Sequence, residues 1–62
     1  MTYRFTVPPT MEQGGFSGVA RGSYYETYRK NALWDYNSAR AHDALPPLTR
    51  MPNGTTYTKE NT

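Results

Sequence analysis

The pattern of apolar and polar residues predicts an extended segment close to the N-terminus. Large apolar side chains alternate with polar ones in Tyr3-Arg4-Phe5-Thr6-Val7, and a period of two is typical of a strand with one buried face. Pro8-Pro9 ends the pattern. A chain this short offers no obvious second strand unless its C-terminus supplies one. We therefore expect residues 1–9 to form an extended arm, which either adds as an edge strand to the sheet of another protein or lies in surface grooves.

Glycine dominates the next segment, residues 10–22, and predicts a loop. Gly14, Gly15, Gly18 and Gly22 oppose both helix and strand. The phosphate-binding patterns G-x-x-x-x-G-K-[ST] and G-x-G-x-x-G are both missing from this segment. The segment is therefore expected to be a Gly-rich loop that approaches a partner closely, with Phe16 as its candidate anchor.

A helix is predicted over about residues 23–44. Ser23-Tyr24-Tyr25-Glu26 matches the S-x-x-E capping box, and Glu26 and Lys30 stand four residues apart in the favourable order. Nothing interrupts the helical pattern before Pro46-Pro47, which cannot continue it. Such a helix is roughly 30 Å long.

Apolar residues lie on two sides of this predicted helix. At 100° per residue, Trp34, Ala41 and Leu45 stand nearly opposite a stripe that consists of Tyr25, Tyr28, Ala32, Tyr36 and Ala39. A helix on a small domain needs one apolar stripe, so two predict contacts on opposite sides. The simpler alternative is that tyrosine and alanine tolerate exposure while Trp34 packs against the Pro46-Pro47 return.

The remaining segment, residues 45–62, is predicted to be an extended, Pro-containing tail. Leu45-Pro46-Pro47-Leu48 favours a polyproline conformation, which lies across a surface at little further entropic cost. Asn53-Gly54 predicts a turn, with residues 55–58 as a candidate short strand after it. Pro52 weakens a regular hairpin there because it cannot donate to a strand ladder.

Composition then shapes the expected fold. Only seven of the 62 residues are Leu, Ile, Val or Phe, and there is no cysteine, whereas aromatic residues make up 15%. We therefore expect one unit that is mostly irregular or extended around a single helix, has little independent hydrophobic core and folds on a partner. Aromatic side chains suit protein interfaces. The candidate interface residues are Tyr3, Phe5, Phe16, Tyr25, Tyr28, Trp34, Tyr36, Leu45 and Leu48.

Chemical motifs are sparse. The single histidine, His42, lies near the predicted helix C-terminus, where a cation favours the helix dipole, and the five carboxylates are dispersed. We expect no catalytic, cofactor or metal site, and therefore no enzyme. No apolar run approaches the length of a membrane span, so the chain is expected to be soluble or peripheral, with its compartment open.

These expectations favour a structural role among larger protein subunits. The function they predict is a small subunit that bridges or cements a multi-subunit assembly, with a virion component, such as a minor capsid, decoration or tail-associated protein, as the preferred setting. An accessory subunit of a respiratory or photosynthetic complex is an alternative. Nucleic-acid binding is a second alternative, because cations and aromatic rings interleave from Arg21 to Trp34, although Glu26 and Asp35 dilute the charge.

Overall fold

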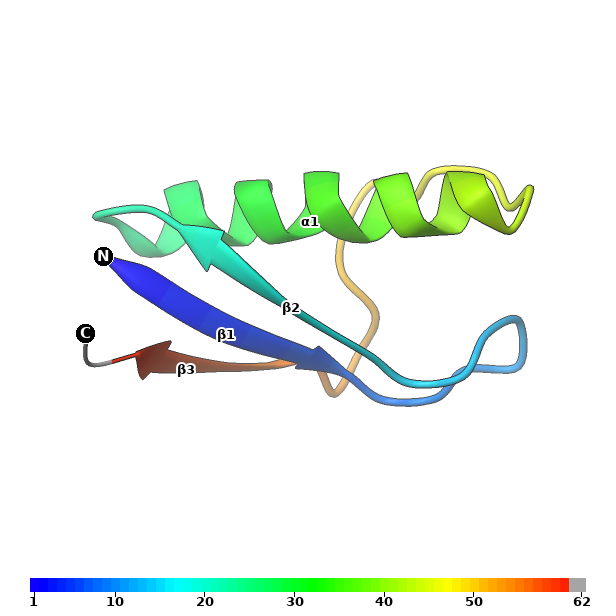
Figure 1. Ribbon diagram of the computed structural model, residues 1–62, viewed down its shortest axis with the longest axis horizontal. Coiled ribbons are helices and arrows are strands. Elements are labelled where there is room, and N and C mark those ends of the chain that lie inside the picture. The colour runs from blue at the N-terminus through cyan, green and yellow to red at the C-terminus, as the bar shows by residue number, and fades with distance from the viewer. Residues whose placement is uncertain (61–62) are drawn as a thin grey trace.

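The computed structural model describes residues 1–60, which form a three-stranded antiparallel sheet with one helix packed on it (Figure 1). The elements follow in the order β1 (Thr2–Val7), β2 (Phe16–Arg21), α1 (Tyr25–His42) and β3 (Thr56–Glu60). In space the strands are ordered β2-β1-β3. The prediction of a mostly irregular or extended chain with little core is therefore wrong.

Strand β1 occupies the centre of the sheet. The alternation in residues 3–7 does mark a strand, but Tyr3 is paired with Ala20 of β2 on one side and with Lys59 of β3 on the other. Because both of its edges are occupied within the chain, β1 is not an arm and cannot add to the sheet of another protein.

Strand β2 overturns the prediction that residues 10–22 are a loop throughout. A Cβ atom at Gly18 would lie 2.7 Å from the Phe5 ring and 2.7 Å from an Asp35 carboxylate oxygen. Glycine is therefore needed at this point of the strand because β1 and the helix both approach it closely. Gly18 is therefore a requirement of tight packing, whereas the sequence alone suggested that the glycines of this segment provide flexibility.

Helix α1 confirms the predicted helix, but the interactions that begin and end it differ from those that the sequence suggested. Tyr24 is the N-cap residue in extended conformation, and no side chain caps the helix, so the expected Ser23 capping box does not form. At the other end, the Leu45 N–H donates to the Arg40 carbonyl at 2.9 Å and the Ala44 N–H to the Ala41 carbonyl at 3.1 Å. With Ala44 at φ 58°, this is a Schellman motif, which ends α1 before the two prolines.

Strand β3 corrects the predicted tail. Gly54, at φ 88°, lies in the turn that the sequence predicts, and the chain then runs antiparallel to β1. Figure 1 shows β3 on the side of β1 away from the helix, which lies mainly over β2. Residues 61–62 of the predicted 45–62 tail lie outside the described residues.

The core lies between α1 and the sheet and is unusually rich in tyrosine. Phe5, Phe16 and Tyr36 meet at one end, with ring centroids 5.8 Å and 5.5 Å apart in the two successive pairs. Aromatic rings bury large apolar areas. They therefore supply the buried apolar surface that the small number of aliphatic residues could not provide. The buried apolar residues are Phe5, Val7, Ala20, Tyr28, Ala32, Tyr36 and Met51.

Candidate functional site

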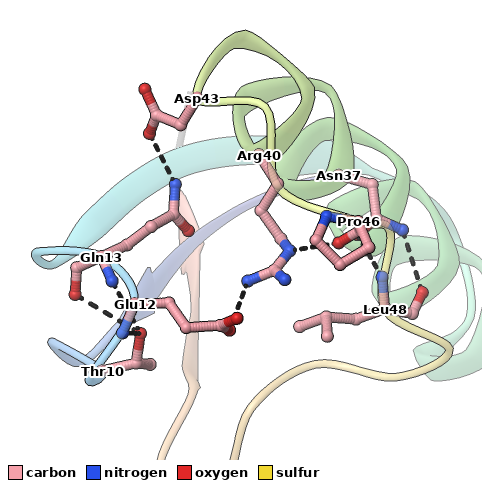
Figure 2. Close-up of polar contacts among 8 residues, drawn as sticks. All are labelled: Thr10, Glu12, Gln13, Asn37, Arg40, Asp43, Pro46 and Leu48. Carbon is pink, nitrogen blue, oxygen red and sulfur yellow. Dashed lines mark hydrogen bonds and ion pairs between the residues drawn. The ribbon is translucent and has the colours of Figure 1, made fainter.

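A polar network fixes the C-terminal end of α1 (Figure 2). Arg40 is 1% exposed; its Nε donates to the Pro46 carbonyl at 2.8 Å and its Nη1 to Glu12 Oε1 at 3.1 Å. Gln13 Nε2 donates to Asp43 Oδ2 at 2.9 Å, beside this pair. The network ties the 8–15 loop and the chain after α1 to the helix, so its charged groups serve the fold.

Asn37 extends this network on the neighbouring side of α1. Its Nδ2 donates to the Leu48 carbonyl at 3.0 Å, and its Oδ1 accepts from the Leu48 N–H at 2.9 Å (Figure 2). One amide side chain therefore satisfies both backbone groups of Leu48. This holds the 45–48 segment against the side of the helix.

Four tyrosines and one arginine meet near the start of α1, and we call Tyr3, Tyr25, Tyr28, Arg29 and Tyr57 the tyrosine cluster. Tyr28 stacks on Tyr3 with centroids 3.8 Å apart and meets Tyr25 and Tyr57 edge-on, each at 5.5 Å. The Arg29 guanidinium lies 4.9 Å from the Tyr25 ring centroid and 5.6 Å from that of Tyr57. Arg29 Nη1 also donates to the Tyr25 hydroxyl at 2.8 Å.

The cluster shifts two pKa values upward. Burial is the main cause that raises the pKa of Tyr28 above 10.0, and the neighbouring tyrosines add to it. The interaction of the guanidinium with the Tyr57 hydroxyl is the main cause that raises the pKa of Arg29, although that hydroxyl makes no hydrogen bond of regular geometry. Arg29 therefore keeps its charge, and Tyr28 stays neutral at ordinary pH.

The Tyr28 shift predicts a loss of stability in alkali. Because the pKa is raised in the folded state, Tyr28 contributes stability that is complete below about pH 10, its unfolded pKa, and is lost as the pH rises through the folded pKa. Tyr28→Phe should flatten this decline in thermal melts followed from about pH 8 to about pH 11. The control is Tyr24→Phe, at an exposed tyrosine outside the cluster. Equal slopes in Tyr28→Phe and the parent protein would refute the assignment.

The side of α1 that faces away from the sheet carries one large apolar residue, Trp34, which is 74% exposed. Around it lie shorter or polar side chains. We define the Trp34 face as this tryptophan with its exposed helix neighbours Thr27, Lys30, Asn31 and Ser38. Trp34 makes no contribution to the buried core, which the opposite side of the helix forms.

A groove of about 520 Å³ runs beside this face, between the first half of α1 and residues 49–51. Its apolar part comes from Leu33, Met51 and Tyr25, and its wall carries three cations and one carboxylate. Lys30 belongs to both the groove and the Trp34 face, so the two surfaces are continuous. The groove residues are Tyr25, Glu26, Arg29, Lys30, Leu33, Thr49, Arg50 and Met51.

The nine candidate interface residues separate into three groups by exposure. Phe5, Tyr28 and Tyr36 are buried in the chain's own core and are not available to a partner. Tyr3, Phe16, Leu45 and Leu48 are half-buried. Tyr25 and Trp34 are exposed, at 56% and 74%, and lie at the groove and on the Trp34 face.

Arg50 and Met51 are site residues that the sequence did not indicate. They join Lys30 and Leu33 across the groove although about twenty residues separate the two pairs in the chain. No local pattern encodes such a juxtaposition, because the turn after α1 creates it.

The interleaved cations and aromatic rings from Arg21 to Trp34 do not form one stripe. Arg21 shares the outer face of the sheet with its partner Thr2, Tyr28 is in the core, and Arg29 is stacked on tyrosines. Apart from the exposed Val19, the outer sheet face is polar, and Arg4 Nε pairs there with Glu60 Oε1 at 2.9 Å. This favours a solvated surface.

Within residues 1–60, no three His, Asp or Glu side chains gather where they could hold a metal ion. Over the same residues, no helix is long and apolar enough to cross a membrane. No family model, curated protein or solved structure matches the chain. The Trp34 face and the groove remain as the candidate functional surfaces.

Proposed function

We propose that this protein is a small non-enzymatic subunit that attaches to a larger protein through the Trp34 face. The observation that carries the proposal is the 74% exposure of Trp34, the largest side chain type, on a helix whose core contacts are complete without it. Tryptophan is among the residues most enriched at interface hot spots, where polar neighbours form the rim. Thr27, Asn31 and Ser38 provide such a rim.

Three of the five carboxylates are engaged in the fold, which supports a binding role over a catalytic one. Arg40, Glu12 and Asp43 are engaged in the network that fixes the end of α1, and Glu60 pairs with Arg4. A general acid or base must reach a substrate with its titrating group. These groups instead satisfy one another across elements of the fold.

The proposed setting is a multi-subunit assembly in which the chain bridges or cements larger subunits. A virion is the preferred assembly, and a respiratory or photosynthetic complex is the alternative. Mass spectrometry of the native particle that contains the chain distinguishes these two settings directly.

Trp34→Ala should weaken attachment to the partner by about 30-fold, equivalent to about 2 kcal/mol, because aromatic hot spots dominate such interfaces. The partner is identified by cross-linking mass spectrometry through Lys30, and its affinity is then measured with purified components. The fold should be unchanged in circular dichroism, since Trp34 lies outside the core.

The matched control is Met11→Ala, which shortens an exposed apolar side chain in the 8–15 loop. We expect it to bind like the parent protein. Parent-like affinity in Trp34→Ala would refute the proposal. Binding to single-stranded DNA that weakens steeply with salt, with a log-log slope of about −0.7 per phosphate contact, would favour the nucleic-acid alternative instead.

A further inference from the structure

We infer that the groove between α1 and residues 49–51 binds an acidic peptide segment, supplied by the same partner that contacts the Trp34 face. This inference rests on the proposed function, and it adds the chemistry of the partner. The groove is continuous with that face through Lys30, so one extended segment can leave the tryptophan and enter the groove.

The excess of positive charge in the groove indicates an acidic ligand. Arg29, Lys30 and Arg50 line the groove, against Glu26 alone. Ion pairs among residues 1–60 join Arg4 to Glu60 and Arg40 to Glu12, which leaves these three cations without a carboxylate partner in the described part of the chain. Carboxylates of a bound segment would complement them.

Arg29 is already held in position for such a contact. Its guanidinium lies over the Tyr25 ring and is fixed by the hydrogen bond from Nη1 to the Tyr25 hydroxyl. Its Nε is buried and has no hydrogen-bond partner. A cation that is immobilised before binding loses little side-chain entropy when a carboxylate arrives.

The apolar part of the groove favours a peptide over a nucleic acid. Leu33 is half-buried and Met51 is buried, and both border the groove beside the cations. A peptide can place an apolar side chain there and carboxylates next to it. A phosphate backbone would bring its charges past Glu26 as well, and three cations provide few phosphate contacts.

The test uses a fluorescein-labelled hexapeptide, Asp-Leu-Asp-Asp-Leu-Asp, and fluorescence anisotropy at low salt. Lys30→Glu combined with Arg50→Glu should weaken its binding about tenfold, which is what two partly exposed charge pairs contribute together. Arg21→Glu combined with Lys59→Glu makes the same charge change at exposed positions outside the groove and should leave binding unchanged. The probe Asn-Leu-Asn-Asn-Leu-Asn should not bind.

Chemical-shift mapping on the parent protein keeps the test independent of variant folding. Shifts induced by the acidic peptide should concentrate at the backbone amides of residues 29–33 and 49–51. Shifts elsewhere, or equal weakening in the two double variants, would overturn the inference. Saturable binding of oligothymidylate that is lost only in the groove variant would also overturn it, since it would assign the groove to nucleic acid.

The two proposals can fail separately. If the acidic peptide does not bind while Trp34→Ala still loses attachment, the groove inference is wrong and the proposed function stands. If the peptide maps to the groove while Trp34→Ala attaches normally, the proposed function is wrong and the acidic-peptide site stands alone.

Discussion

Replacing Tyr36 by alanine is expected to remove about 3–5 kcal/mol of folding free energy, the usual result of deleting a buried aromatic ring. Tyr36 is 0% exposed, and its ring lies 5.5 Å from that of Phe16. A chain of this length has a total stability of about 3–9 kcal/mol. The variant should therefore be largely unfolded or melt far below the parent protein, which urea titration followed by circular dichroism will measure.

Tyr36→Phe is the matched control because it keeps the ring and removes only the hydroxyl. That hydroxyl is buried and has no hydrogen-bond partner. Removing an unsatisfied buried polar group should leave stability unchanged or raise it. Equal losses in Tyr36→Ala and Tyr36→Phe would show that the hydroxyl, and not ring burial, carries the contribution of this residue.

The same titration of the parent chain tests whether it folds without a partner. The core formed by α1 and the sheet predicts one cooperative transition in a monomer. The small number of Leu, Ile, Val and Phe residues suggested instead that the isolated chain does not fold, because that number leaves out the tyrosines. Four of the six, Tyr3, Tyr25, Tyr28 and Tyr57, meet in the tyrosine cluster, and Tyr36 joins the two phenylalanines. Ring burial can offset ordering entropy as aliphatic burial does.

Local patterns predicted the elements whose signals are local. The alternation in residues 3–7 predicts β1, as observed. Of the predicted stripe on α1, Tyr28, Ala32 and Tyr36 are buried, whereas Tyr25 is exposed. Strand β2 was not predicted because Gly18 lowers strand propensity. Glycine is required at this position because Phe5 and Asp35 lie too close for a Cβ atom. That contact exists only after the sheet and helix have assembled.

The candidate site was predictable to a similar extent. Trp34 stands opposite the tyrosine and alanine stripe in the sequence, but the alternative that it packs against the Pro46-Pro47 return is wrong, because its side chain is 74% exposed. The groove could not be predicted, because it depends on the path that carries Arg50 and Met51 back alongside α1. Two features set that path: the Schellman turn at Ala44 and the hydrogen bonds between Asn37 and Leu48. Neither feature has a strong sequence signature. In the Schellman turn, Ala44 occupies the position that is usually glycine.

Removal of Glu12, the ion-pair partner of the buried Arg40, is expected to destabilise the fold. Glu12→Ala should cost about 3 kcal/mol, because it leaves a guanidinium that is 1% exposed without its carboxylate. The Pro46 carbonyl still accepts from Nε, but a neutral acceptor does not compensate the charge. Hydrogen exchange should show the opening of the 8–15 loop, which Glu12 and Gln13 tie to α1.

A double-mutant cycle separates charge burial from lost packing. Arg40→Met alone should cost less than Glu12→Ala, because the freed Glu12 side chain is 52% exposed and can be hydrated. Adding Arg40→Met to Glu12→Ala should then recover much of the lost stability, since an apolar side chain of similar length replaces the uncompensated cation. If the two losses simply add, the ion pair does not couple the loop to the helix, and the bond between Gln13 and Asp43 is what ties the 8–15 loop to the end of α1.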